Sequence, residues 1–128
     1  MILTAHQPVY LPWIGLFHKI ALSDLFCYFD IVQYQRKDYN NRNKIKTSNR
    51  ELWLSVPVES KNHLEKNVSE ILIVQDNWVK KHIKSIELNY KKTFFFDKYF
   101  PSLKTILINE SQDTLGQLNL KLLEYFLQ

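Results

Sequence analysis

Glycine is scarce in this sequence, and its scarcity excludes several common site architectures. Only Gly15 and Gly116 are present among 128 residues. Two distant glycines cannot form the GxxxxGKS/T loop that cradles phosphates, nor the GxGxxG turn of dinucleotide-binding proteins. The GxSxG turn that presents a catalytic serine is also missing. The sequence therefore excludes these three ways of building a nucleotide-binding or hydrolytic site.

Cysteine is equally rare, which excludes an internal disulfide. The one cysteine, Cys27, lies within an aromatic run, and this context predicts a small core residue rather than a nucleophile. The histidines are scattered along the chain without an HExxH pair. They are His6, His18, His63 and His82. Spacing therefore predicts no metal site.

Long apolar runs are missing as well, and none approaches the ~20 residues that a membrane-spanning helix needs. The first residues lack the basic start, apolar run and cleavage site of a signal peptide, so we expect a cytoplasmic protein. Hydrophobic residues nevertheless make up 45% of the chain and aromatic residues 14%. This content is enough for one core, and we expect a single α/β domain over residues 1–128.

The first thirty residues predict a βαβ unit. Residues 2–5 form a short apolar run, residues 13–22 repeat apolar side chains at helical spacing, and residues 25–30 are dense in aromatics. A crossover of this kind is right-handed and joins parallel strands. The carboxyl ends of both strands then meet at one edge, which brings His6 and Asp30 to the same side of the sheet.

Two further segments predict strands, and the remainder predicts helices. Residues 51–58 alternate in polarity, and residues 68–74 carry a short apolar run. We therefore expect a small, mostly parallel, Rossmann-like sheet of about three or four strands, followed by a helical C-terminal part.

Three helices are predicted in that C-terminal part. Asp76 can cap a helix that runs to about Lys92, Pro101 can start a second, and Asp113 or Thr114 can cap the last. The last helix carries an apolar stripe that needs a partner. The stripe consists of Leu115, Leu118, Leu122 and Phe126.

The strand-to-helix elbow from His6 to Gly15 is the most distinctive segment. Pro8 and Pro12 make it stiff, and an elbow at a strand end is where ligands of open α/β sheets bind. A histidine there suits two roles, acid–base chemistry with a ligand or anchoring of the loop. Gln7 and Tyr10 likewise can either orient a ligand through hydrogen bonds or hold the loop together.

Residues 31–50 predict a long, basic loop. They contain six cations and one acid, Asp38. The cations are Arg36, Lys37, Arg42, Lys44, Lys46 and Arg50. The run Asn41–Lys46 combines a guanidinium, two amides and two ammonium groups, which suits a diphosphate, although an exposed basic loop explains it equally. Gln33, Tyr34 and Tyr39 either stack on a base or pack the loop.

Several of these segments together resemble the WbqC-like family. They are His6–Gly15, Lys19-Ile20, Ser23-Asp24, Asp30, Val32–Tyr34, Asn41–Lys46 and Trp53–Val58. The resemblance implies a role in the synthesis of bacterial surface polysaccharides such as O-antigen or capsule. Members of the family are longer, so the resemblance also implies that residues 1–128 are the N-terminal portion of a larger domain whose second half closes the site.

The resemblance and the residues together define the expected site. We expect an anionic small molecule, a nucleotide or nucleotide-linked sugar, and transfer of an acyl or aminoacyl group to an amino sugar. His6 and Asp30 are the candidate catalytic residues. The candidate substrate-binding residues are Gln7, Tyr10, Trp13, Gln33, Asn41, Arg42, Asn43, Lys44 and Lys46. The residues specify no cofactor and no metal.

Two other classes of function remain open. A nucleic-acid-binding module would use the basic residues 36–50 with Tyr34, Tyr39 and Trp53 as stacking platforms. A non-catalytic subunit, or one part of a split enzyme, would instead associate with a second copy or a missing half through the apolar stripe of the last helix.

Overall fold

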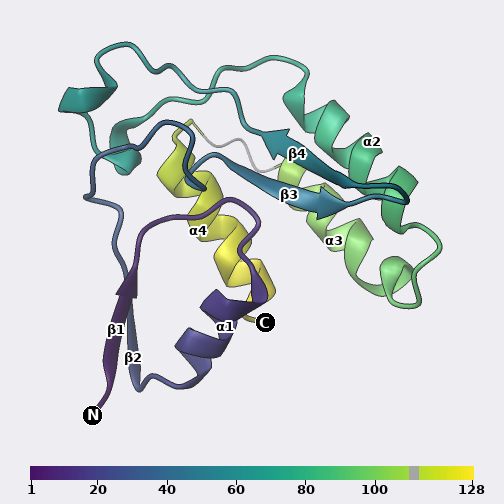
Figure 1. The fold of residues 1–128 in the computed structure, drawn as a ribbon, viewed down its shortest axis with the longest axis horizontal. Helices are drawn as coiled ribbons and strands as arrows, with labels where there is room; N and C mark the ends of the chain where they lie inside the picture. Colours follow the sequence, from purple (N-terminus) through teal and green to yellow (C-terminus); the bar gives the residue numbers. More distant parts are fainter. Residues whose placement is uncertain (110–112) are drawn as a thin grey trace.

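The computed structural model describes residues 1–109 and 113–128 of the chain and shows four α-helices, two short 3-10 helices and two small sheets within them (Figure 1). The strands are β1 (Leu3–His6), β2 (Leu25–Tyr28), β3 (Arg42–Lys46) and β4 (Glu51–Ser55). The α-helices are α1 (Ile14–Ala21), α2 (Trp78–Tyr90), α3 (Phe96–Asn109) and α4 (Leu115–Phe126). Two short 3-10 helices are η1 (His63–Glu65) and η2 (Val68–Glu70).

The predicted βαβ unit is confirmed. Strands β1 and β2 pair in parallel, with His6 opposite Tyr28, and α1 connects them. The helix begins and ends within one residue of the predicted range, because its apolar residues recur at helical spacing. His6 ends β1, as expected for a residue that opens the elbow.

The prediction of one mostly parallel sheet is wrong. Strands β3 and β4 form an antiparallel hairpin that is separate from the β1–β2 pair, and a Rossmann-like arrangement is not confirmed. Residues 42–46 were predicted as loop because they are almost entirely polar. They form a strand because Ile45 faces the core beside Leu52, while alternate positions carry Arg42 and Lys44 on the outer face.

The strand predicted over residues 68–74 is also absent. Asn67 and Glu70 form a capping box that starts the 3-10 turn of η2, and only isolated bridges follow, between Ile73 and Val58 and between Leu72 and Thr114. The segment is apolar because Val68, Ile71 and Ile73 are buried in the core. A short buried run looks the same in sequence whether it forms a strand or an irregular segment.

The C-terminal helices follow the predictions with two corrections, of which the first is that Asn77, rather than Asp76, is the N-cap of α2. Asp76 Oδ1 accepts the Trp78 N–H at 2.7 Å, and Thr114 caps α4 through the N–H of Gln117. Helix α3 begins at Phe96 rather than at Pro101. Pro101 therefore lies inside the helix, where its missing N–H leaves the carbonyl of Asp97 without the usual helical donor.

The core lies between the inner face of the β3–β4 hairpin and helices α2, α3 and α4. Its members include Tyr10, Leu54, Val56, Val68, Ile71, Ile83, Ile86, Leu115, Leu118 and Leu122. The last three belong to the stripe that we expected to bind a second copy or a missing half. All three are buried within this chain, and Phe126 packs against Phe17 with ring centroids 5.9 Å apart. Association with a second copy or a missing half stays a prediction.

The β1–β2 pair lies at one side of the molecule, away from the hairpin (Figure 1). We expected buried strands, but Leu3, Leu25 and Cys27 are exposed. Cys27 is therefore not a core residue. Within the described residues, no helix has both the length and the apolar character that crossing a bilayer requires.

Candidate functional site

Residues 39–43 hold the elbow in place through main-chain and side-chain hydrogen bonds. The N–H of Tyr10 donates to the carbonyl of Tyr39 at 3.1 Å. The buried Asn40 donates its Nδ2 to the carbonyl of Pro8 at 2.8 Å, and Asn119 on α4 donates to the carbonyl of Asn40 at 2.8 Å. Two segments that are far apart in sequence are thus tied together, and α4 braces them.

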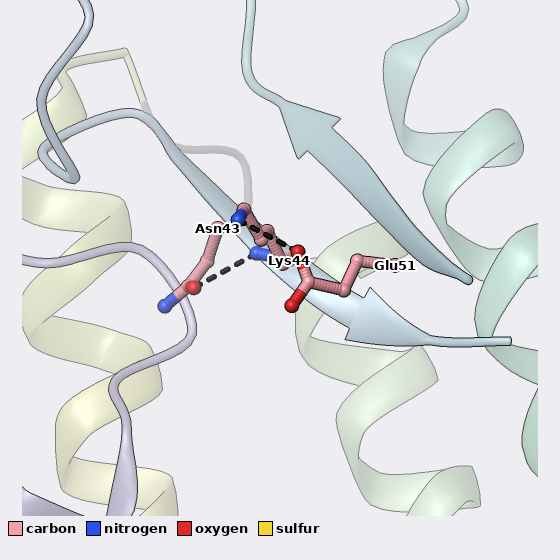
Figure 2. A network of polar contacts seen from close by, with 3 residues as sticks. All are labelled: Asn43, Lys44 and Glu51. Carbon is pink, nitrogen blue, oxygen red and sulfur yellow. Dashed lines mark hydrogen bonds and ion pairs between the residues drawn. The ribbon is translucent and has the colours of Figure 1, made fainter.

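Asn43 completes this attachment at the most strained point of the elbow. Leu11 has φ 47°, in the left-handed region that side chains disfavour. Asn43 Nδ2 donates to the carbonyls of Tyr10 at 3.1 Å and Leu11 at 2.7 Å, while its Oδ1 accepts the Lys44 N–H at 2.8 Å. Figure 2 shows the Asn43 side chain pointing from β3 toward the elbow. This single amide therefore fixes the strained backbone.

A cleft opens where these two segments meet. It has a volume of about 370 Å³ and is lined by Trp13, Tyr39 and Asn43. The indole of Trp13 lies over Gly15, where any Cβ would overlap the ring. Two aromatic side chains and an amide make this cleft suited to a flat, polar ring.

His6 lies beside the cleft, with its ring edge-on to Trp13 and the ring centroids 5.4 Å apart. Its Nδ1 is 2.8 Å from the carbonyl oxygen of Gln7. A carbonyl only accepts, so Nδ1 carries the hydrogen and the neutral ring keeps a lone pair on Nε2. His6 can therefore accept a proton at Nε2. Among the described residues, no cluster of three His, Cys, Asp or Glu side chains is able to hold a metal ion.

The outer face of the hairpin adds positive charge beside the cleft. The Arg42 guanidinium lies 4.1 Å from the ring centroid of Trp53, and Lys44 Nζ lies 5.0 Å from it. Tyr39, which lines the cleft, contacts the same indole with centroids 5.7 Å apart. Lys44 also pairs with Glu51 at 2.7 Å, and this hydrogen bond raises the pKa of Lys44 (Figure 2).

Arg42 has a structural task in addition. Its Nη2 donates to the carbonyl of Lys37 at 2.6 Å and its Nε to that of Asp38 at 3.3 Å. Lys37 has φ 59°, so the guanidinium supports a strained turn that leads into Tyr39. The same side chain thus shapes the loop and places charge on the outer face.

Comparison with known proteins identifies the family of this chain. The model of the WbqC-like protein family matches residues 7–128. The chain belongs to the WbqC-like family. It is similar to the uncharacterized protein Rv1507c of Mycobacterium tuberculosis, with 38% identity over 117 residues. The match covers 91% of this chain and 51% of Rv1507c, so the chain spans about half the length of this curated relative. No solved structure matches the chain.

Tyr10 of this WbqC-like chain does not line the cleft. It is fully buried, and its hydroxyl is 2.7 Å from His82 Nδ1. His82 Nε2 is 3.0 Å from the carbonyl oxygen of Ser55, so Nε2 donates there and Nδ1 accepts from Tyr10. Burial raises the pKa of Tyr10 and lowers that of His82 to about 4. Tyr10 is therefore a core residue that links the elbow to α2.

Asp30 is not joined to His6 in the described part of the WbqC-like chain by any hydrogen bond or ion pair. It lies near Tyr28, whose pKa is raised by burial first and by the Asp30 charge second. The main-chain carbonyl of Asp30 accepts the Ser69 N–H at 3.2 Å. Asp30 does not line the cleft, and its neighbour Tyr28 donates its hydroxyl to the carbonyl of Gly116.

Four other predicted site residues do not line the cleft. Asn41 donates to the carbonyl of Val56 at 2.9 Å and closes the hairpin. The N–H of Lys46 donates to the Tyr90 hydroxyl at 2.9 Å, beside a second hollow. The bridge of Gln33 to Asn67 holds it near η2. Gln7 contributes the carbonyl that orients His6. The cleft and its basic side therefore retain His6, Trp13, Arg42, Asn43 and Lys44 from the predicted set.

Two residues that shape the cleft of this WbqC-like chain were not predicted as substrate-binding residues. Tyr39 lines the cleft, although the sequence indicated only that it either stacks or packs. Gly15 makes room for Trp13. In the sequence, only its position two residues after a tryptophan indicated this role. Leu11 has no such signal, because a leucine gives no indication of a left-handed backbone.

Proposed function

We propose that the cleft between the elbow and residues 39–43 binds a nucleotide or a nucleotide-linked sugar. The observation that carries this proposal is the cleft of Trp13, Tyr39 and Asn43 beside a basic outer face. The base stacks against Trp13 or Tyr39, which is worth roughly 1–3 kcal/mol for each stacked base. Asn43 Oδ1, which accepts the Lys44 N–H, has a second lone pair that accepts a hydrogen bond from the ring.

Arg42 and Lys44 hold the phosphates in this arrangement. The guanidinium lies over the Trp53 ring and donates from Nε and Nη2 to main-chain carbonyls, so its Nη1 is the group that contacts an anionic oxygen, while Lys44 acts as a point charge. Arg42, Lys44 and the cleft residue Tyr39 all contact the Trp53 ring, so a base in the cleft has its phosphates near these two cations. Glu51 competes for Lys44, and an incoming phosphate must replace that ion pair.

His6 is the base for the transfer reaction that we propose. The amine of an amino sugar forms a bond to the carbonyl carbon of an activated acyl group, the leaving group departs from that carbon, and His6 Nε2 takes the amine proton. Membership in the WbqC-like family supports surface-polysaccharide synthesis as the setting. The substrate, the donor and the role of the chain in a longer protein are all part of this proposal.

Thermal unfolding in the presence of ligands tests the binding step. A ligand that binds the native state raises the midpoint by mass action. We expect nucleoside diphosphates or their sugar derivatives to raise it for the wild-type chain and to leave it unchanged for Trp13→Leu and Arg42→Gln. Leu64→Ser, at an exposed position on η1, is the matched control and should retain the shift. Absence of any shift in the wild type would contradict the proposal.

A single-stranded nucleic acid is the competing ligand, because Trp53, Tyr39 and Arg42 form an exposed stacking surface. It would extend over several nucleotides, and its affinity would fall steeply with salt. Titration of short oligonucleotides and of mononucleotides at several salt concentrations separates the two. Tight binding of oligonucleotides without binding of mononucleotides would favour the nucleic-acid module.

A further inference from the structure

An exposed aromatic tip lies at the turn between α2 and α3. Phe94 is 92% exposed and Phe95 57%, and their rings meet edge-on with centroids 4.9 Å apart. Tyr99, one turn into α3, is 54% exposed and contacts Phe95. We name Phe94, Phe95 and Tyr99 the aromatic tip. Large aromatic side chains that gather at one exposed turn indicate a binding surface rather than ordinary surface residues.

The apolar surface extends beyond the tip itself. An open hollow of about 220 Å³ adjoins it, and Phe95, Tyr99 and Phe126 are among the residues that line the hollow. These side chains lie on α3, on α4 and in the turn between α2 and α3. The tip is therefore the projecting part of a continuous apolar face.

Lysines surround the aromatic tip. Lys91 and Lys92 precede it with only Thr93 between, and Lys98 Nζ lies 5.2 Å from the ring centroid of Tyr99. Between positions 91 and 99 the only acid is Asp97. Exposed phenylalanines within a basic rim are complementary to a surface that is negatively charged outside and apolar beneath.

A second, polar hollow lies next to the tip on the side of the hairpin. It has a volume of about 730 Å³ and joins the β3–β4 turn, from Lys46 to Ser48, to the end of α2, including Lys91 and Lys92. Figure 1 shows these two turns side by side at the edge of the molecule. The Tyr90 hydroxyl accepts the Lys46 N–H at 2.9 Å, so its own hydrogen is available to donate into the hollow. Three ammonium groups and a hydroxyl suit a phosphate group.

We propose that this face docks on an anionic lipid bilayer, with the aromatic tip in the interfacial layer and a lipid phosphate in the polar hollow. A protein partner is less well matched, because lysine is depleted from the centre of protein interfaces. An anionic bilayer attracts every lysine near its surface, and aromatic rings favour the interface between headgroups and acyl chains. The proposal is independent of the ligand of the cleft.

Flotation with lipid vesicles tests the proposal on the full 128-residue chain. We expect the chain to float with vesicles of equal parts phosphatidylcholine and phosphatidylglycerol, and not with phosphatidylcholine alone. Phe94→Ser with Phe95→Ser should weaken binding by at least about tenfold, because the apolar contact is lost. Lys91→Gln with Lys92→Gln should weaken it by roughly 30-fold, since each cation near an anionic surface contributes about fivefold.

Matched variants show whether the effect is local. Lys80→Gln with Lys81→Gln removes the same charge from the other end of α2, and Leu64→Ser removes an exposed apolar side chain on η1. Both should bind vesicles like the wild type. Circular dichroism of every variant should be unchanged, because the substituted side chains are exposed.

Three results would overturn the proposal. The first is that the wild-type chain does not float with anionic vesicles. The second is that the matched controls lose as much binding as the test variants. The third is that the Phe94→Ser, Phe95→Ser variant binds as well as the wild type. If the first of these results is accompanied by self-association that is lost in the Phe94→Ser, Phe95→Ser variant, the face belongs to a second copy of the chain.

Discussion

Gly15 is the residue whose missing side chain defines one wall of the cleft. The Trp13 indole occupies the space where a Cβ would lie. Gly116 has a different reason to be a glycine, because a Cβ there would meet the Ser69 main chain at 3.1 Å. Gly15 is therefore needed for the shape of the cleft, whereas Gly116 is needed for the packing of the fold.

Gly15→Ala should displace Trp13 without destabilising the chain. Alanine favours a helix over glycine by up to about 1 kcal/mol, so the thermal midpoint should stay equal or rise. Nucleotide affinity should fall by roughly tenfold, because a stacking partner has moved. Isothermal titration and thermal unfolding measure both quantities. Gly116→Ala is the control and should lower the midpoint; unchanged nucleotide affinity in Gly15→Ala would argue against the role of Trp13.

His82 makes the stability of the chain depend on pH. Burial lowers its pKa from 6.5 to about 4. Above pH 6.5, His82 is neutral in both the folded and the unfolded chain. As the pH falls toward 4, His82 binds a proton in the unfolded chain but not in the folded chain. The free energy of unfolding should therefore fall by up to about 3 kcal/mol through this window. Denaturant unfolding from neutral pH to about 4 measures it, and His82→Gln should show a shallower dependence. If the free energy of unfolding falls equally with pH in the wild type and in His82→Gln, His82 is not the group responsible.

At the scale of one side chain, the sequence predicted which residues are polar but not which are buried. His6 and Asn43 were predicted as site residues, and the structure places them beside and within the cleft. Tyr10 and Trp13 looked equivalent, yet one is in the core and the other is half exposed. That difference is set by α2 and residues 39–43, which lie far from the elbow in sequence.

At the scale of secondary structure, the elbow and strand β3 behave as one unit. The helices were predictable because their apolar residues repeat along a single segment. Strand β3 was not, because only Ile45 of its five residues is apolar and its pairing with β4 supplies the rest of its stability. The polar side chain of Asn43 has its partners in the elbow, which no local pattern reveals.

Asn43→Ala should abolish nucleotide binding as well as lower the stability of the chain, because it frees the elbow. It removes two hydrogen bonds to carbonyls that are held in a strained segment, at a cost of about 1–3 kcal/mol. Asn41→Ala is the matched control, because it removes one hydrogen bond to Val56 and leaves the elbow alone. Both variants should unfold at lower denaturant concentration, but only Asn43→Ala should lose nucleotide binding. Loss of binding in both would mean that general destabilisation is responsible.

At the scale of the whole molecule, the chain has a well-packed side and an open side. The hairpin and helices α2, α3 and α4 share the core, whereas the β1–β2 pair stands at the edge with exposed apolar residues. Parallel sheets are normally covered on both faces. The sequence predicted the parallel pair, but the division into two sheets depends on pairing between distant segments, for which composition gives no signal.

Cys27 reports on that open side. Since it is exposed, a thiol reagent should modify it in the folded chain at a rate close to that in the denatured chain. The chain has one cysteine, so the mass of the product counts this site alone. Mass spectrometry over time, with and without denaturant, gives both rates. A rate that is many times slower in the folded chain would show that this face is covered.

The brace between α4 and the elbow also sets an order of events during synthesis. Asn119 holds Asn40, and Asn40 holds Pro8, so a residue near the end of the chain maintains the geometry of its beginning. Proteins are made from the N-terminus. A nascent chain that has not yet released α4 from the ribosome therefore has β1, α1 and the hairpin available, but it lacks the support that gives the cleft its shape.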